Sequence, residues 1–197
     1  HDLGFALGPR INAGGRVGKS DLGVRLLTTQ DENEARAIAQ ELDLFNEERR
    51  AIEALVQDEA ERIAQHQGNR AMLLVSGDGW HPGVIGIVAG RLKEKFSRPA
   101  IVIATDEAGT GKGSGRSITG VDLGAAILAA KDSGLLLAGG GHAMAAGLTV
   151  ERTRIDALHD FLDERLAADI AAASAERHLP VDSLLSPRGL NPQLVHD

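Results

Sequence analysis

Between residues 31 and 66 the chain contains neither glycine nor proline, and apolar residues recur every three or four positions among charged ones. This spacing places the apolar residues on one face of an α-helix. The segment is therefore predicted to form one long amphipathic helix, or two helices joined near Asn46, acting as a strut or a connector between domains. The apolar positions are Ala35, Ile38, Leu42, Phe45, Ile52, Val56 and Ile63.

After Gly68-Asn69 short continuous apolar runs replace the helical spacing. Such runs are typical of buried strands, and a helix begun by Pro82 separates the first two of them. Strand, helix, strand in this order is a βαβ-like unit and indicates an α/β fold. We expect strands at 71–75, 99–104, 113–118, 135–138 and 147–150, and further helices at 122–131, capped by Asp122, and at 153–173.

Residues 1–20 combine two turn signals, Gly8-Pro9 and Gly14-Gly15, with interleaved basic residues. The plainest interpretation is a basic surface loop, followed by a short helix that Ser20 or Asp21 caps and that extends through Leu27. The chain opens without a Met, which we interpret as the start of a fragment. From residue 178 the composition changes abruptly, as expected for a connection into a further domain.

Composition narrows the range of functions. Four Phe, one Trp and no Tyr argue against a protein that stacks many bases on aromatic rings. The absence of Cys excludes disulfides and thiolate metal sites. Without a long apolar run or a signal-peptide pattern, we expect a soluble, cytoplasmic protein that has no contact with membranes.

The net charge of −7 is unevenly distributed, because the predicted helices are acidic whereas the Gly-rich segments are locally basic. A protein that coats DNA through its overall charge is therefore excluded. A nucleic-acid-binding protein with few, local phosphate contacts is compatible with this distribution.

The stretch 136–147 places three glycines and His142 after a short apolar run. Glycines let a ligand approach the backbone closely. If Ala143 to Ala146 form a helical turn, its free N–H groups would favour an anion, with His142 at the mouth of the site. The alternative is a tight strand-to-helix turn that carries a surface histidine.

A second Gly-rich stretch, 109–118, is similar to a phosphate-binding P-loop only superficially. Gly113 follows Lys112 where the motif needs Ser or Thr, and Asp106 stands where its first Gly should be. The stretch fits a strand or hairpin better, with Ser114, Arg116 and Ser117 as donors to phosphate oxygens. A Gly-rich hairpin with an exposed Arg remains the alternative.

Trp80-His81 lies where the first predicted strand leads into its helix. His81 could contact a ligand there, or it could cap the helix beside a buried Trp.

Together these segments resemble the RecJ family of single-strand-specific DNA exonucleases, which belongs to the DHH phosphoesterase superfamily. Four motifs in the order of that family span residues 8 to 147. They are Gly8-Pro9-Arg10-Ile11-Asn12-Ala13-Gly14-Gly15-Arg16, the run 79–89 that begins Gly79-Trp80-His81-Pro82, Gly113-Ser114-Gly115-Arg116-Ser117, and Gly139-Gly140-Gly141-His142.

The resemblance implies a mixed-sheet DHH-associated domain flanked by helices and preceded by a long connecting helix. Its domain boundaries would be 1–30 for the end of the DHH catalytic domain, 31–67 for the connecting helix, 68–176 for the DHH-associated domain and 177–197 for the lead-in to an OB-fold. It also implies a role in substrate binding for a set of residues. They are Asn12, Arg16, His81, Ser114, Gly115, Arg116, Ser117, Gly139, Gly140, Gly141 and His142.

The metal-binding motifs of the family, Asp-x-Asp and Asp-His-His, do not occur in the sequence. We therefore expect no catalytic or metal-binding residue in this chain and no activity from it alone. For the full-length enzyme the resemblance implies Mn²⁺ or Mg²⁺ bound outside the chain, and two-metal hydrolysis of single-stranded DNA in the 5′→3′ direction. It further implies a role in DNA repair and recombination, and a helicase or single-strand-binding protein as a cellular partner.

Two other functions share parts of the pattern. One is a related DHH-family phosphodiesterase that acts on short oligonucleotides or cyclic dinucleotides. The other is a non-catalytic nucleic-acid-binding module, such as the similar domain appended to alanyl-tRNA synthetases. The Gly-Pro-Arg-Ile-Asn run and Trp80-His81 favour the exonuclease.

Overall fold

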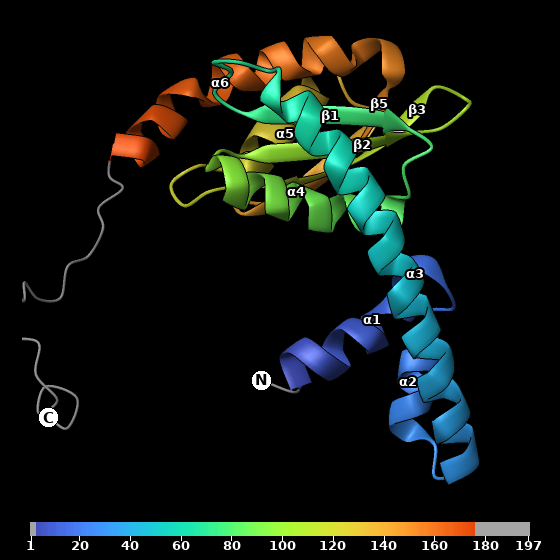
Figure 1. Ribbon diagram of the computed structural model, residues 1–197. Coiled ribbons are helices and arrows are strands. Elements are labelled where there is room, and N and C mark those ends of the chain that lie inside the picture. Colours follow the sequence, from blue (N-terminus) through green and yellow to red (C-terminus); the bar gives the residue numbers. More distant parts are fainter. Residues whose placement is uncertain (1–2, 176–197) are drawn as a thin grey trace, which may run out of the picture.

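The computed structural model describes residues 3–175 of the 197-residue chain. A helical N-terminal part and an α/β part are joined by the long helix α3, Glu32–Gln65 (Figure 1). The helical part contains a π-helical segment, Leu3–Leu7, and the helices α1, Gly8–Val17, and α2, Leu22–Thr28. The predicted lead-in to an OB-fold at 177–197 lies outside the described residues. Among the residues described, no helix is both long and apolar enough to span a membrane.

The α/β part contains one five-stranded mixed sheet in the order β1-β2-β3-β5-β4. Strands β1 and β2 are parallel, and the other neighbouring pairs are antiparallel. Helix α4 connects β1 to β2, which confirms the predicted βαβ unit. The bounds are Leu73–Asp78 for β1, Pro82–Phe96 for α4, Ala100–Thr105 for β2, Thr110–Arg116 for β3, Leu123–Asp132 for α5, Ala138–His142 for β4, Ala145–Glu151 for β5 and Ile155–Ala175 for α6, after a 3₁₀ turn at Arg152–Arg154.

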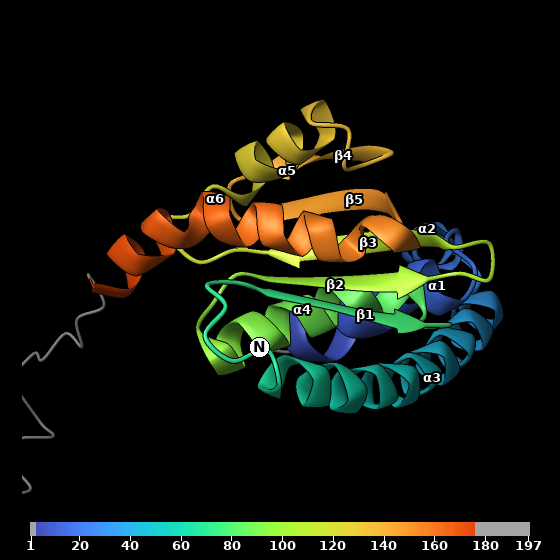
Figure 2. The same ribbon diagram turned by 90° about the horizontal axis from the view of Figure 1, so that it is seen from above.

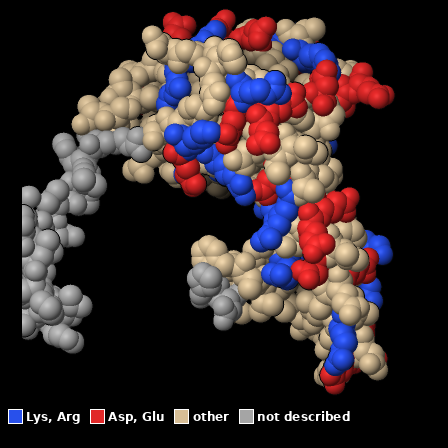
Figure 3. Space-filling view, viewed as in Figure 1, with Lys and Arg blue, Asp and Glu red and all other residues tan. Residues whose placement is uncertain are grey.

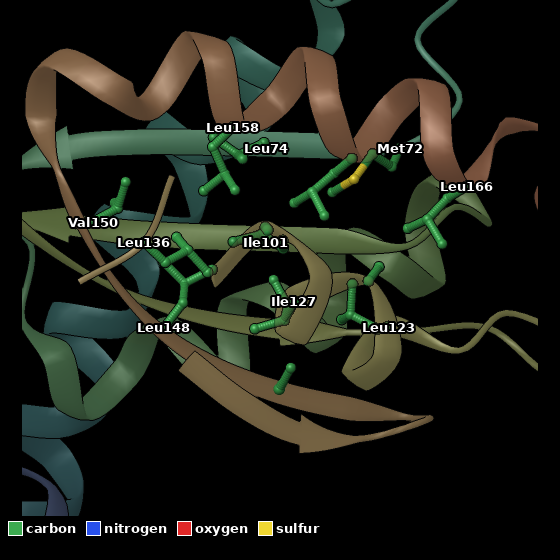
Figure 4. Close-up of a cluster of buried hydrophobic side chains, with 14 of the residues drawn as sticks. Met72, Leu74, Ile101, Leu123, Ile127, Leu136, Leu148, Val150, Leu158 and Leu166 are labelled. Atoms are coloured by element: carbon green, nitrogen blue, oxygen red, sulfur yellow. The ribbon is translucent and has the colours of Figure 1, made fainter. Parts of the chain in front are cut away.

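Helices cover the two faces of the sheet unequally (Figure 2). Helices α5 and α6 bury one face through a cluster that includes Met72, Ile101, Ile127 and Leu158 (Figure 4). On the other face, α3 and α4 pack on β1 and β2 through the cluster that contains Val84. The main apolar clusters of this second face do not extend to β5 and β4, so part of the sheet surface stays open beside α4.

Helix α3 is one continuous helix of 34 residues, with no break at Asn46. Its first turn is capped because the Asp31 carboxylate accepts hydrogen bonds from the backbone N–H groups of Asn33 and Glu34. The helix packs on α1 and α2 near its start and on α4 and β1 near its end. It therefore sets how the helical part and the α/β part lie relative to one another.

The prediction of a loop over residues 1–20 was wrong, because Gly8-Pro9 and Gly14-Gly15 both lie within α1. Pro9 occupies the first turn of the helix, where a missing N–H costs no hydrogen bond. Gly14 is required by packing, since a Cβ there would lie 3.0 Å from Leu42 Cδ2 and 2.8 Å from the Lys19 carbonyl oxygen. Asp21 precedes α2 as predicted, but its side chain caps no backbone N–H.

The predicted helical turn at Ala143–Ala146 and the strand at 135–138 were also wrong. The three glycines form the middle of β4, and the chain returns as β5 after a tight connection. Small residues permit this hairpin, because a Cβ on Gly139 would lie 2.9 Å from Ile127 Cγ2 and one on Gly141 would lie 2.4 Å from the Ala145 carbonyl oxygen. No helix therefore follows His142 directly; the helix that begins beside this hairpin is α5, whose Leu123 N–H donates to the Ala143 carbonyl oxygen at 3.1 Å.

Candidate nucleic-acid interface

Strand β3 presents polar side chains on the open face of the sheet. Lys112, Ser114 and Arg116 alternate with glycines at 111, 113 and 115, which face the opposite, apolar core. A Cβ on Gly115, for example, would lie 2.7 Å from Leu123 Cδ2. Gly115 is therefore a packing residue, and the three polar residues are the ones available to a ligand.

The register of the hairpin places small residues beside these polar ones. Ser114 pairs with Gly147, which pairs with Gly140, so one row crosses three strands with two glycines in succession. A Cβ on Gly140 would meet nothing within 4 Å, and one on Gly147 would only just reach the Gly113 carbonyl oxygen. The packing of the fold does not require glycine at either position, and the pair leaves a shallow floor on which a ligand can lie against the backbone.

His142 lies in the adjacent row, which runs from Arg116 through Ala145 to His142. Neighbouring strands are about 4.8 Å apart, so Arg116 and His142 stand roughly 10 Å from one another across the floor. His142 is exposed, whereas Arg116 is half-buried. The two predicted donors are thus on the same side of the sheet, at opposite edges of the glycine floor.

Helix α4 forms the wall beside β3. A Cβ on Gly86 would lie 3.0 Å from Ser114 Oγ and 3.1 Å from Arg116 Nη2, so Gly86 leaves the space that the guanidinium occupies. Arg116 Nη1 donates to Ser114 Oγ, at 3.2 Å, and to the Gly115 carbonyl oxygen, at 2.8 Å. These bonds hold the guanidinium in place while its other nitrogen atoms remain available to an acceptor.

The helical part contributes Arg16, which lies in the last turn of α1. Its Nη1 donates to the Gly83 carbonyl oxygen at 3.0 Å, and a Cβ on Gly83 would lie 2.2 Å from the Arg16 carbonyl oxygen. Glycine at 83 therefore lets α1 contact α4 directly. Through this contact, a residue distant in the sequence joins the residues of β3.

Arg16, Lys112, Ser114 and Arg116 line one open cleft of about 400 Å³, together with Gly83, Gly86 and Gly147. No Asp or Glu in the part of the chain that the structure describes lines it. Among residues 3–175, no carboxylate pairs with Arg16, Lys112 or Arg116, whereas Arg10, Arg70 and Arg152 all have such a partner. Three cations without a counter-charge make the cleft a site for an anion.

In Figure 3 the molecule is hollowed between the α/β part and the helical part, and Lys and Arg side chains lie on the side of the connecting neck that faces the hollow. The cleft, which Arg16 of α1 and Arg116 of β3 both line, brings basic residues of the two parts together. We call this cleft the phosphate cleft.

Eight predicted site residues do not line the phosphate cleft: Gly115, Gly140 and His142, described above, and Asn12, His81, Ser117, Gly139 and Gly141. Ser117 is buried and its hydroxyl donates to the Val121 carbonyl oxygen at 2.7 Å, so it stabilises the loop after β3. His81 caps α4, because its Nδ1 accepts the Gly83 N–H at 3.0 Å. The neutral ring then carries its proton on Nε2. Gly139 and Gly141 are packing residues, because a Cβ on either one would lie on the side of β4 that faces the buried core.

Asn12 is exposed on α1, one helical turn before Arg16, and is not part of the cleft lining. Sequence reasoning missed Lys112, Gly83, Gly86 and Gly147, which do line it. The signal for Lys112 was present, because it lies two residues from Ser114 and four from Arg116 in a strand. The α4 glycines carry no such signal, since only the packed structure shows what a side chain there would displace.

In the described part of the chain, no group of three or more His, Asp or Glu side chains is arranged to hold a metal ion. The cleft offers donors and positive charge instead of anionic ligands. Its chemistry is therefore that of binding an anion, such as a phosphodiester, through hydrogen bonds and charge.

The DHHA1 domain family matches residues 67–168 of the chain. Curated relatives include a single-stranded-DNA-specific exonuclease RecJ from Dickeya dadantii, 46% identical over 162 residues, and one from Thermus thermophilus, 34% identical over 197 residues. These alignments cover 79% and 100% of this chain, but each covers only 28% of the relative.

A solved structure of Thermus thermophilus RecJ in complex with Mn²⁺ aligns with a TM-score of 0.76 and 31% identity. The alignment covers 99% of this chain and 28% of that one, and a second structure of the same protein was solved with Mg²⁺. The described fold, with its mixed sheet and long preceding helix, agrees with this similarity. The chain belongs to the DHHA1 domain family and, within the DHH superfamily, to the RecJ family.

Proposed function

We propose that this chain is the substrate-binding part of a single-strand-specific DNA exonuclease and that the phosphate cleft holds the backbone of the DNA. The observation that carries the proposal is the group of three cations, Arg16, Lys112 and Arg116, that line one cleft without a carboxylate partner in the described part of the chain. The names of the curated relatives support the choice of single-stranded DNA as substrate.

The geometry supports a different contact with the DNA backbone for each of the cleft residues. The Arg116 guanidinium, held over Gly86, can present its free N–H groups as a fork to two phosphate oxygens. Ser114 adds a hydroxyl beside it, and Arg16 and Lys112 add positive charge. All of these groups suit the sugar–phosphate backbone, so binding is expected to be indifferent to base sequence.

His142 is proposed to approach the strand from the far edge of the glycine floor. Its place in the row of Arg116 supports contacts on two sides of a strand that crosses Gly140 and Gly147. In a full-length enzyme, donors at this position would stabilise the charge that develops on a phosphoryl group.

Metal chemistry does not fit the described residues, because they contain no suitable group of ligands. Relatives that were crystallised with Mg²⁺ and Mn²⁺ support the use of divalent metals in the family. We assign metal binding and two-metal hydrolysis to a part of the full-length protein outside this chain. The 5′→3′ direction, the role in DNA repair and recombination, the cytoplasmic location and a helicase or single-strand-binding partner are included in this proposal as what the resemblance implies.

The domain division completes the proposal. Residues 1–30 would end the DHH catalytic domain, 31–67 would connect the two parts, and 68–176 would form the DHH-associated domain. The continuous helix α3 and the DHHA1 match at 67–168 support this division.

A binding titration of single-stranded DNA against the 197-residue chain tests the proposal. We expect weak binding that does not depend on sequence and that Arg116→Ala reduces at least about 10-fold, the scale of losing charge-assisted hydrogen bonds. Lys131→Ala is the matched control, because it removes a cation from α5 on the opposite face of the sheet. Equal losses for the two variants, or strong base discrimination, would contradict the proposal.

A further inference from the structure

A second cavity, of about 500 Å³, lies beyond the end of β3, where the phosphate cleft ends. Its lining begins with Ser117, the residue after Arg116, and continues along the loop through Thr119 and Gly120. Lys93, Glu94 and Ser97 form its α4 side, and Met144 and Ala173 complete it. The two cavities therefore follow one another along the same pair of elements, β3 and α4.

Helix α4 shows that the cavities share one wall. Gly83 and Gly86 line the phosphate cleft, whereas Lys93 and Ser97 line the second cavity. Gly83, Gly86 and Lys93 are separated by steps of three and seven residues, so they lie on one face of the helix, and Ser97 is the residue that directly follows it. Gly90 is on the same face, between the two groups.

Packing does not explain why position 90 is glycine. A Cβ there would meet nothing within 4 Å, in contrast to Gly83 and Gly86, whose Cβ atoms would be crowded. Glycine inside a helix costs about 0.8–1 kcal/mol relative to alanine. A side chain at position 90 would enter open space on the stretch of α4 that lies between the linings of the two cavities, and we call this stretch the passage.

The lining of the second cavity suits one nucleotide of a strand. Lys93 supplies an ammonium group, which forms an exposed ion pair with Glu94 at 3.6 Å that a phosphate would have to displace, and Ser97 and Thr119 supply hydroxyls. The exposed Met144 supplies a polarisable apolar surface for a sugar or a base. The backbone of Met144 is held beside the cavity, because its carbonyl oxygen accepts the Ser117 N–H at 3.0 Å.

We propose that a strand bound in the phosphate cleft continues past Arg116 and over Gly90 into the second cavity, which holds an adjoining nucleotide. Lys93 then contacts its phosphate and Met144 packs on its sugar or base. This inference rests on the proposed function, since it extends the path of the same strand. Continuity with the phosphate cleft is the reason for choosing this ligand over a separate small molecule.

The test compares two thymidine oligonucleotides, one of two and one of eight nucleotides, that bind to the 197-residue chain. Gly90→Leu fills the passage and Lys93→Gln removes the cation. We expect each variant to weaken binding of the eight-nucleotide strand about 5-fold and to leave binding of the dinucleotide unchanged. Lys93→Gln should also lower the slope of log affinity against log salt by about 0.7, the value for one phosphate contact on a single strand.

Two controls separate the outcomes. Lys131→Gln removes an equal charge from the opposite face and should affect neither oligonucleotide, and thermal melts show whether Gly90→Leu remains folded. Unchanged binding of the eight-nucleotide strand, or equal losses for both lengths, would overturn the inference. If Arg116→Ala changes neither oligonucleotide, the proposed function itself fails; if it weakens both while the Gly90 and Lys93 variants change nothing, only the extension fails.

Discussion

Gly86→Ala is expected to separate stability from ligand binding. The new Cβ would lie 3.0 Å from Ser114 Oγ and 3.1 Å from Arg116 Nη2, closer than ordinary van der Waals contact. Both contacted atoms are ends of side chains, so they can move by a few tenths of an ångström without disturbing the backbone. The guanidinium would then be displaced from its position over α4.

The magnitudes follow from this geometry. Alanine in a helix interior is favoured over glycine by about 0.8–1 kcal/mol, which the new contacts offset only in part. The melting temperature should therefore stay the same or rise by up to about 4 °C. A misaligned Arg116 guanidinium would weaken its charge-assisted hydrogen bonds to phosphate oxygens, which contribute about 1.5–3 kcal/mol. Affinity for single-stranded DNA should therefore fall about 10-fold or more.

The assay pairs a thermal melt with a titration of the thymidine dinucleotide. Gly90→Ala is the matched control: it lies on the same helix, offers the same gain in propensity, and its methyl group meets nothing within 4 Å. It should raise stability and leave dinucleotide binding unchanged. A Gly86→Ala protein that binds the dinucleotide as tightly as wild type would refute the assigned position of Arg116.

Four further predictions concern other parts of the molecule. In a full-length enzyme that carries the metal motifs, Arg116→Ala and His142→Ala should each lower exonuclease turnover about 100-fold without changing the melt, and Arg116→Lys should restore little; near-normal rates would remove the cleft from the mechanism. The 197-residue chain alone should not cleave DNA with Mg²⁺ or Mn²⁺, and hydrolysis by rigorously purified chain would contradict the assignment of the metal site elsewhere. Glu53 is buried between two arginines of α3 and α4, so Glu53→Gln should lower the free energy of unfolding by about 3 kcal/mol in denaturant titrations, whereas the exposed Glu47→Gln should change it by under about 0.5 kcal/mol. Burial holds the pKa of His159 below its ordinary value of about 6.5, so the unfolded chain binds more protons there and stability should fall as the pH drops below 6.5; His159→Gln should flatten this part of the pH profile, and an unchanged profile would exclude the residue.

Elements with strong local patterns were predictable from the sequence. The long helix followed from apolar spacing without glycine or proline, and the βαβ unit followed from two apolar runs around Pro82. In both cases the buried apolar residues recur at the period of the helix or strand that they form. The residues next to one another in the sequence are therefore sufficient to predict the element.

Glycines were the main source of error. Gly14-Gly15 indicates a turn when only its neighbours are considered, but both residues lie in a helix. Position 14 is glycine because Leu42 of α3 occupies the place of a side chain there. The glycines of β4 were likewise assigned to a turn before a helix. These positions are glycine because residues distant in the sequence contact them closely. A local sequence pattern carries no information about such contacts.

The buried face of α3 shows a similar limit. Between the apolar Leu42 and Val56, its buried positions are Asn46, Arg49 and Glu53. Arg49 Nη2 donates to Asn46 Oδ1 at 3.0 Å, and Glu53 pairs with Arg49 and with an arginine of α4. Charged residues normally indicate a solvated face, so the burial of these side chains could not be expected from the sequence.

Of the predicted site, Ser114, Arg116 and Arg16 line the phosphate cleft, and Gly140 and His142 share the open face of the sheet. Motif resemblance named these residues, but it also named Gly115 and Ser117, which support the packing. Residues that hold a ligand and residues that shape the strand occur together in one motif. The two kinds of residue can be distinguished only by the face of the sheet on which each side chain lies.

A map of backbone amide shifts would show whether single-stranded DNA binds in the phosphate cleft. Single-stranded oligothymidylate is titrated into the isotopically labelled chain, and the perturbed amides are placed on the structure. We expect the perturbed amides to gather at Gly86, Ser114, Arg116 and Gly147, and the changes to fade as salt rises. Shifts gathered on α5 and α6, on the opposite face of the sheet, would contradict this expectation.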